Sequence, residues 1–331
     1  MRYLSKEIEK LSNLQEFIVF ENRLTGTIPP SIGNISTLEN FVVKDNNLDG
    51  NIPPEIGKLS SLKGLSLKSN NFSGKVPSTI FNISTLQKFD LGSNNLFGNL
   101  QPGLRHRISP SLEELILSQN QFTGTIPSCI SNASQLIKLD LGTNMFSGHV
   151  PSEIENLQQL EYFNIQYNQI TNEPSANELS LLTSLSKCKN LKMVGLSGNP
   201  FNTVLPNLLG IGNNKSLSLE WLDASGCHLK GRIPSGISNF INLIALGLND
   251  NKLSGSFPET LGRRLLRLQD SNFFTSSIPL GFWNNKDILE MGLSSNLLSG
   301  ALSSEIGSMH SMVYLNLSDF MDLFPSHLIV S

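Results

Sequence analysis

Several features of enzymes and nucleic-acid-binding proteins are scarce or missing in this sequence of 331 residues. Charged residues make up only 15% of it, and its formal net charge is −3, which disfavours a long cationic surface for nucleic acid. The five histidines lie at no metal-binding spacing. The sequence contains neither a phosphate-binding glycine loop nor the kinase set of a glycine-rich loop, a catalytic Asp and D-F-G. We therefore predict no metal, no cofactor and no enzymatic activity, kinase activity included.

Cysteine is also rare, with Cys129, Cys188 and Cys227 at wide spacing and no Cys-x-x-Cys pair. This pattern disfavours both a disulfide-dense scaffold and a cysteine zinc site, and the odd count leaves at least one thiol unpaired within the chain. No apolar run is long enough for a membrane span. The charges in the first ten residues interrupt any apolar stretch of the kind a secretion signal needs.

A repeat runs through nearly the whole chain. Residues 14–22, 38–46 and 62–70 share the pattern L-x-x-L-x-L-x-x-N, with Phe or Val at some Leu positions and a period of 24 residues. Alternate leucines of a short strand fill the core between stacked coils, and the Asn side chain can satisfy turn backbone groups. Cys227 replaces one Asn, so its coil should be less well satisfied. The anchors of the twelve coils are Asn22, Asn46, Asn70, Asn94, Asn120, Asn144, Asn168, Asn199, Cys227, Asn251, Asn272 and Asn296.

A second motif, L-x-G-x-I-P, follows the anchors and is clear in residues 24–29, 48–53 and 229–234. Its Gly permits a tight bend, and its Pro stops the segment from continuing as a strand or helix. Together the two motifs resemble the plant-specific class of leucine-rich repeats. The resemblance implies an α/β solenoid, a leucine-rich-repeat horseshoe with a parallel concave β-sheet and short helical or 3-10 segments on the convex side.

A long coil, residues 177–190, and the following segment 218–227 are similar to the ectodomains of immune-type leucine-rich-repeat receptor-like kinases. Within the long coil, Ser175 and Glu178 have the spacing of a capping box, and leucines recur at helical intervals. We therefore predict a convex-side helix over residues 176–187.

The ends of the chain depart from the repeat. Residues 1–13 match the back half of a coil, residues 14–311 form the predicted solenoid, and residues 312–331 contain a broken thirteenth coil and an out-of-frame tail. Phe320 stands at the Asn position of that last coil. Solenoids need polar caps over their end coils, so we expect exposed apolar ends and self-association.

One internal coil is three residues short, since Asn272 follows Asn251 by only 21 residues. Its two inward strand positions would then hold Arg267 and Gln269. A one-residue slip turns Leu266 and Leu268 inward instead, at the cost of a bulge. We predict the slip, because burying an unpaired Arg267 side chain would cost several kcal/mol.

The outward strand positions are the candidate binding residues. Coils three to six carry a mixed-charge strip, which is either a binding surface or a solvated face with compensating charges. Coils seven to nine place large aromatic residues outward, as binding anchors are placed, although Trp221 could instead pack flat on neighbouring strands. The predicted ligand-binding residues are Lys88, Asp90, Lys138, Asp140, Tyr162, Asn164, Gln166, Tyr167, Met193, Trp221 and Asp223.

Sequons for N-glycosylation are present at several positions. Asn34, Asn82 and Asn132 each follow an anchor by twelve residues and so share the convex face, where glycans would leave the concave face free. Asn316 is an exception, because it falls on the concave side of the broken coil. The predicted acceptors are Asn34, Asn71, Asn82, Asn132 and Asn214.

The resemblance implies a non-catalytic recognition module, the ectodomain part of a plant receptor-like kinase in defence signalling. Such a module would bind a peptide or protein ligand and a co-receptor with leucine-rich repeats, and it would bind no nucleic acid. The implied location is the extracellular side of the plasma membrane, a location that the N-terminal sequence itself does not support. Two alternatives stay open, a cell-wall inhibitor of pectin-degrading enzymes and a truncated gene product without function.

Overall fold

The computed structural model describes residues 3–100, 108–207, 218–258, 267–268, 271–283, 286–300 and 302–319. The chain divides into two compact units, unit 1 (Met1–Ile170) and unit 2 (Thr171–Ser331).

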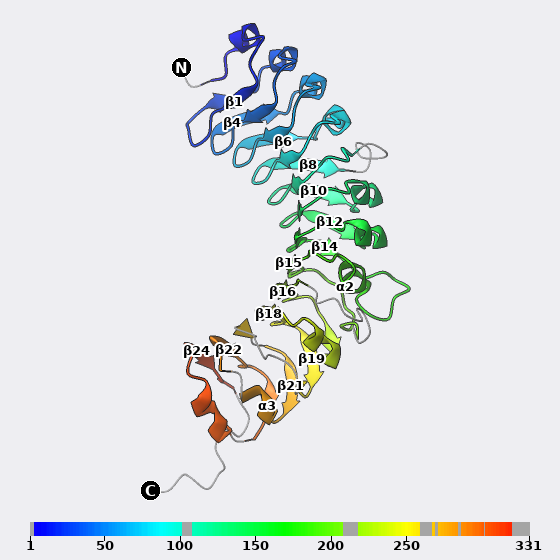
Figure 1. The fold of residues 1–331 in the computed structure, drawn as a ribbon, viewed down its shortest axis with the longest axis vertical. Coiled ribbons are helices and arrows are strands. Elements are labelled where there is room, and N and C mark those ends of the chain that lie inside the picture. The colour runs from blue at the N-terminus through cyan, green and yellow to red at the C-terminus, as the bar shows by residue number, and fades with distance from the viewer. Residues whose placement is uncertain are drawn as a thin grey trace. The chain divides into compact units, whose positions relative to one another are not determined.

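Unit 1 is built on a main sheet to which each coil contributes one short parallel strand (Figure 1). The middle residue of each strand points into the core, and Phe41, Leu65 and Phe89 are buried there in register. Their neighbours on either side point outward, because side chains alternate along a strand. In sheet order the strands are β1 (Glu16–Ile18), β3 (Asn40–Val42), β5 (Gly64–Ser66), β7 (Lys88–Asp90), β9 (Glu114–Ile116), β11 (Lys138–Asp140) and β13 (Tyr162–Asn164).

A second parallel sheet and a row of 3-10 helices complete the coils of unit 1. The L-x-G-x-I-P motif makes the transition between them, since its Ile is buried and its Pro precedes or caps the helix, as Pro29 does for η2. The strands are β2 (Thr25–Gly26), β4 (Asn47–Asn51), β6 (Asn71–Gly74), β8 (Asn95–Asn99), β10 (Gln121–Gly124), β12 (Met145–Gly148) and β14 (Gln169–Ile170). The helices are η1 (Lys6–Lys10), η2 (Pro30–Asn34), η3 (Pro54–Lys58), η4 (Ser78–Asn82), η5 (Ser128–Asn132) and η6 (Ser152–Asn156). Parallel strands with short helical segments opposite them (Figure 1) confirm the predicted leucine-rich-repeat fold class.

Most anchor asparagines are buried and tie their coil to the preceding one, whereas Asn22 is exposed and Asn120 is half-buried. In Asn70, Oδ1 accepts a hydrogen bond from Leu48 N at 3.0 Å. Its Nδ2 donates to the carbonyl oxygens of Val43, Leu67 and Lys68 at 3.0, 3.2 and 3.1 Å. One side chain thus satisfies backbone groups of two coils, which is the role that the sequence predicts. The same set of bonds recurs at Asn46, Asn94, Asn120, Asn144, Asn168 and Asn251.

Cys227 holds the anchor position of its coil with weaker bonds, as predicted. Its buried Sγ lies 3.3 Å from Leu196 O and 3.4 Å from Ser225 O, and one thiol hydrogen can serve only one of them at a time. In other coils the backbone N–H equivalent to that of Phe201 donates to Oδ1 of the anchor Asn. Phe201 N donates instead to Asn199 O at 2.9 Å. Although Cys227 stands in place of Asn, the backbone N–H of Phe201 therefore still has a hydrogen-bond acceptor.

Unit 2 has the same arrangement of parallel strands, but its helical segments include two α-helices as well as 3-10 helices. Its main-sheet strands are β15 (Met193–Gly195), β16 (Trp221–Asp223), β18 (Ala245–Gly247), β20 (Arg267–Leu268), β22 (Glu290–Gly292) and β24 (Tyr314–Asn316). A four-stranded sheet contains β17 (Lys230–Gly231), β19 (Lys252–Gly255), β21 (Phe273–Ser276) and β23 (Leu297–Leu298). The helices are α2 (Ser180–Leu185), η7 (Ser235–Asn239), α3 (Leu280–Trp283) and η8 (Ser304–Ser308).

The predicted helix over residues 176–187 is too long, because α2 covers only Ser180–Leu185. Glu178 and Leu179 are extended and pair with Val204, so the helix cannot begin before them. The capping box is not formed, since Glu178 Oε2 accepts from Asn207 N at 3.3 Å. Instead, Oδ1 of Asn172 accepts hydrogen bonds from the backbone N and Oγ of Ser180.

The strand of the short coil is shifted by one residue relative to Asn272, as predicted, but the shift has the opposite direction. In β20, Leu268 pairs with the buried Leu246 and Met291, so it takes the first inward position of the strand rather than the second. Arg267 pairs with Ala245 at an outward position. Leu266 and Gln269 lie outside the described residues. Leu268 precedes Asn272 by four residues, whereas Leu246 precedes Asn251 by five, so one of the three missing residues falls between the strand and the anchor and the other two fall before the strand.

The thirteenth coil forms a strand in spite of its broken motif. In β24, Tyr314, Leu315 and Asn316 pair in parallel with Glu290, Met291 and Gly292 of β22. Phe320, at the predicted Asn position, lies outside the described residues.

Candidate binding surfaces

The outward residues of the main sheet stand in rows, because neighbouring strands pair without offset. Adjacent members of a row are about 4.8 Å apart, the spacing of hydrogen-bonded strands. Two rows of unit 1 contain predicted ligand-binding residues. The first row is Lys88, Glu114, Lys138 and Tyr162, and the second is Asp90, Ile116, Asp140 and Asn164.

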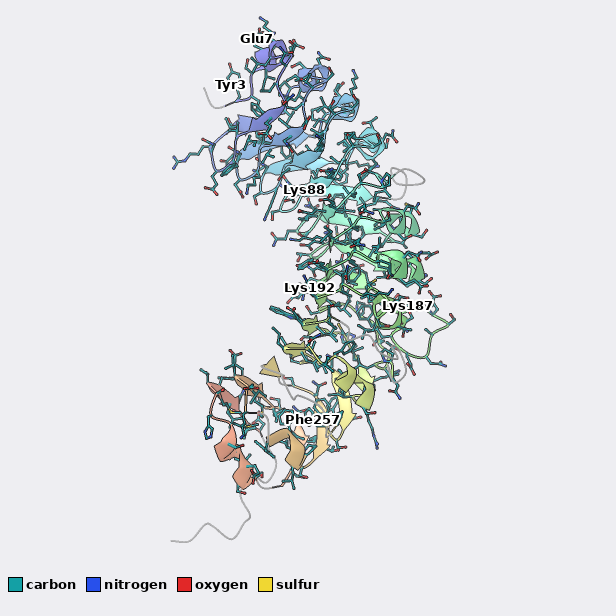
Figure 2. All side chains as sticks on the ribbon, in the orientation of Figure 1. Tyr3, Glu7, Lys88, Lys187, Lys192 and Phe257 are labelled. Atoms are coloured by element: carbon teal, nitrogen blue, oxygen red, sulfur yellow. The ribbon has the colours of Figure 1, made fainter. Side chains whose placement is uncertain are left out.

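The cations of the first row are already engaged. Lys88, which lies on the strand side of unit 1 (Figure 2), forms an ion pair with Glu114 at 2.9 Å. The hydrogen bond and charge of Glu114 raise the pKa of Lys88. Lys138 Nζ lies over the ring of Tyr162, 4.8 Å from its centroid. Burial, together with the negative charge of Asp140, raises the pKa of Tyr162, so its phenol is a neutral hydrogen-bond donor at physiological pH.

The second row is held by bonds to the following turn. Oδ1 of Asp90 accepts from Gly92 N at 3.0 Å, and Oδ1 of Asn164 accepts from Gln166 N at 3.0 Å. Nδ2 of Asn164 also donates to Oδ1 of Asp140 at 2.8 Å. Burial raises the pKa of Asp90, and the bond from Gly92 N opposes this shift. These polar side chains are therefore fixed in position before any ligand arrives.

Tyr167 is the most exposed large aromatic residue of this region, at 62%. It occupies the turn position just before the anchor, where the backbone has a positive φ in every coil that the structure describes. Its own φ is 53°, in the left-handed region that disfavours large side chains. Other coils of unit 1 place Asp45, Ser69 or Thr143 there. A bulky aromatic at this position gains no burial, which favours a contact with a partner.

In unit 2, Trp221 and Asp223 lie on the outward face of the same strand, β16. Trp221 pairs with Met193 of the neighbouring strand, and its side chain is 44% exposed. Oδ1 of Asp223 accepts from Ser225 N at 3.0 Å. Gly195 and Gly247 flank Asp223 in the neighbouring strands, so no side chain stands on either side of it in its row.

The comparisons with known proteins agree with this geometry. A family model described as leucine rich repeat matches residues 110–170, and a second leucine-rich-repeat model matches residues 13–35, 61–83 and 218–240. The chain contains leucine-rich repeats and has the leucine-rich-repeat fold. Among curated proteins, none matches its sequence.

Several solved structures similar to this chain are ectodomains of plant receptor kinases. The ectodomain of the Arabidopsis thaliana receptor kinase GASSHO1/SCHENGEN3, in complex with CASPARIAN STRIP INTEGRITY FACTOR 2, is 30% identical with a TM-score of 0.78 over 96% of this chain and 40% of that one. The Arabidopsis receptor kinase HAESA, with the peptide hormone IDA and the co-receptor SERK1, is 29% identical with a TM-score of 0.78 over 96% and 56% of the chains. The Leptospira interrogans leucine-rich-repeat protein LIC12759 is 27% identical with a TM-score of 0.76 over 97% and 76%.

The alignments also show how much of each relative this chain matches. The leucine-rich-repeat chain spans about half the length of the receptor ectodomains that it matches. Its resemblance to ectodomains of plant receptor kinases therefore rests on the repeats themselves.

The predicted ligand-binding residues lie in both units. Lys88 to Tyr167 belong to unit 1, whereas Met193, Trp221 and Asp223 belong to unit 2. Sequence reasoning named Gln166 in the row two residues beyond the second one, but it missed the corresponding row of unit 2, to which Ser197, Ser225 and Asn249 belong. The same alternation, continued past the strand into the turn, would have found it.

Four of the sequon asparagines that the structure describes are exposed, and Asn316 is half-buried. Asn34, Asn82 and Asn132 are the last residues of η2, η4 and η5, on the helical side as predicted, and Asn71 begins β6. Asn316 lies in β24 of the main sheet. Asn214 lies outside the described residues.

Other site types were sought over the described part of the chain. It contains no cluster of His, Cys, Asp or Glu able to hold a metal ion, and no helix long and apolar enough to cross a membrane. Its three cysteines are free, with Cys188 and Cys227 buried.

Proposed function

We propose that the main sheet of this leucine-rich-repeat protein binds an extended peptide, as part of the ectodomain of a plant receptor kinase at the cell surface. The observation that carries the proposal is the exposure of large aromatic side chains beside fixed polar groups on that sheet. Tyr167 and Trp221 are solvent-exposed, and Asn164 and Asp223 next to them are held by backbone bonds. Large aromatic side chains are frequently the residues that contribute most to binding energy in an interface.

The printed complexes of the structural relatives support the choice of ligand. GASSHO1/SCHENGEN3 is solved with a CASPARIAN STRIP INTEGRITY FACTOR, RGFR1 with RGF2, PEPR1 with AtPEP1 and HAESA with IDA. HAESA is also solved with the co-receptor SERK1, which supports a co-receptor as a second partner. Binding by surface complementarity needs no reacting group, and we propose no catalytic step.

The sequons support a location outside the cell. Glycans on Asn34, Asn82 and Asn132 would lie at the ends of the 3-10 helices and leave the main sheet accessible. Expression in a secretory plant system, followed by glycopeptide mass spectrometry, tests this placement. Occupancy of Asn316 in the sheet, with these three positions bare, would contradict it.

Selection of binders from a displayed library of peptides about twelve residues long tests peptide binding on the sheet. We expect Trp221→Ala or Tyr167→Ala to weaken the selected peptides by roughly tenfold or more, as hot-spot truncations do. Phe273→Ala and Phe97→Ala are matched controls, because both side chains are about half exposed but stand on the smaller sheets. Binders that lose affinity with the controls and keep it with the main-sheet variants would refute the proposal.

A further inference from the structure

A small polar cradle lies on the main sheet of unit 2, over Gly247. A Cβ atom built on Gly247 would meet Oδ1 of Asp223 at 2.6 Å and Oγ of Ser225 at 2.9 Å. Two oxygen atoms from β16 and its turn therefore converge above a residue of β18 that has no side chain. Any larger residue at position 247 would displace them.

The cradle offers hydrogen-bond acceptors rather than donors. The hydroxyl of Ser225 donates to Oδ1 of Asn249, and Nδ2 of Asn249 donates to Oδ2 of Asp250 at 2.6 Å. Oδ1 of Asp223 accepts from Ser225 N. The side-chain donors of this network are thus turned toward its own members. A carboxylate has about four lone-pair sites, so Asp223 can accept more than one hydrogen bond.

A neighbouring hydroxyl lacks a hydrogen-bond partner. Ser197 holds in the preceding coil the place that Ser225 holds in its own coil, and it is only 4% exposed. Among the described residues, its Oγ is the buried side-chain oxygen or nitrogen atom without a partner. Buried polar atoms are rarely left unpaired, and one next to the cradle favours a bound polar group or a water that accompanies it.

Trp221 supplies a flat surface beside the carboxylate. It precedes Asp223 by two residues on the same face of β16, which places their Cα atoms about 6.6 Å apart. A planar guanidinium can stack on an indole ring while its N–H groups bond to a carboxylate, and it does so better than a compact ammonium group.

We propose that Trp221, Asp223, Ser225 and Gly247 form a subsite for the guanidinium group of an arginine side chain in a bound peptide. The inference rests on the proposed peptide binding and adds the chemical class of one ligand residue. The guanidinium stacks on Trp221 and donates to Asp223 and Ser225. Because Gly247 has no side chain, Oδ1 of Asp223 and Oγ of Ser225 can lie close together above it and face the guanidinium.

The test uses the two tryptophans of the chain as reporters. Trp283 is 2% exposed and serves as the internal reference for the exposed Trp221 in two-dimensional NMR spectra of the indole N–H groups. The probe is the pentapeptide acetyl-Ala-Ala-Arg-Ala-Ala-amide. The comparison peptides contain citrulline, which has the same shape without charge, or lysine. We expect the arginine peptide alone to shift the Trp221 signal saturably, with roughly tenfold weaker binding of lysine and no saturation by citrulline.

Asp223→Asn is the decisive variant. We expect it to fold, because other coils of this chain already have Asn at the same position. Asn164 and Asn316 hold the same position in their coils, and each accepts the same turn bond, from Gln166 N at 3.0 Å and Ser318 N at 3.1 Å. We expect Asp223→Asn to weaken the arginine peptide at least tenfold, because it removes a charge-assisted bond. Gly247→Ala should do the same by filling the cradle. Glu290→Gln, on the same sheet face in β22, is the matched control and should change nothing.

The outcomes separate this inference from the proposed function. Equal shifts by the citrulline peptide, no saturable shift with arginine, or full binding by Asp223→Asn would overturn the arginine subsite. If library peptides without arginine bind and depend on Trp221, peptide binding stands and only the subsite falls. If the library yields no binder while the arginine probe saturates, the subsite stands and the extended-peptide function falls.

Discussion

Replacing the anchor Asn70 by Ala tests the structural role assigned to the repeated asparagines. The three carbonyl oxygens that Asn70 serves each keep another donor. Val43 O also accepts from Asn46, Leu67 O from Asn94, and Lys68 O from Asp45 N. The amide of Leu48 has no other acceptor among the described residues, so the substitution leaves one buried N–H group unpaired.

The expected loss follows from this count. An unpaired buried N–H group costs about 1 to 3 kcal/mol, and the weakened carbonyl bonds add about 1 kcal/mol. We therefore expect Asn70→Ala to lower the free energy of unfolding by roughly 2 to 4 kcal/mol, measured by denaturant titration followed by circular dichroism. Hydrogen exchange at the Leu48 amide should accelerate more than exchange at amides of distant coils.

The matched control is Asn71→Ala, because Asn71 is adjacent in sequence but exposed. It should change the free energy of unfolding by less than about 0.5 kcal/mol, as surface substitutions do. Two results would refute the reasoning. One is a loss for Asn70→Ala no larger than that of the control, and the other is an unchanged exchange rate of the Leu48 amide.

Two further predictions concern groups whose pKa is shifted by burial. Burial raises the pKa of Cys227 to about 12, so the folded state holds its proton more tightly than the unfolded state does, and the free energy of unfolding should fall as pH rises above about 9, by at most about 1.4 kcal/mol per pH unit. Cys227→Ser should remove this part of the slope in denaturant titrations between pH 8 and 10, and an identical slope in both proteins would exclude Cys227 as its source. Burial also raises the pKa of Asp90, so its ionised form is disfavoured in the folded state, and Asp90→Asn should raise the melting temperature at pH 7 and have less effect at pH 3. A lower melting temperature at pH 7 would show that the charge of Asp90 is stabilising.

The fold could be predicted from the sequence because the repeat constrains the same positions many times. Inward leucines, the anchor and the L-x-G-x-I-P bend agree in each regular coil, so one irregular coil cannot change the architecture. The errors occurred where the frame breaks. The capping-box spacing of Ser175 and Glu178 suggested a longer helix, but a local pattern cannot show that Glu178 pairs with Val204 in a later coil.

The slip at β20 is a second case of this kind. The sequence shows that one residue must be absorbed, since Arg267 is unfavourable in the core, but both directions of slip turn Leu268 inward. Pairing with Leu246 and Met291 decides between them, and that register depends on the neighbouring coils. Local hydrophobic pattern predicts that the strand shifts, whereas tertiary pairing determines where it settles.

The candidate site was harder to predict because its residues carry no repeat. Outward positions are free to vary without loss of core packing, so alternation identifies which residues face solvent but not which of them act together. Trp221 and Asp223 were accessible to that reasoning, as outward residues of one strand. The cradle was not, since it depends on the absence of a side chain at Gly247 and on the hydroxyl of Ser225 in the turn. In the proposed cradle, the missing side chain at Gly247 is therefore as necessary as the side chains of Asp223 and Ser225, because a Cβ atom there would displace both oxygens.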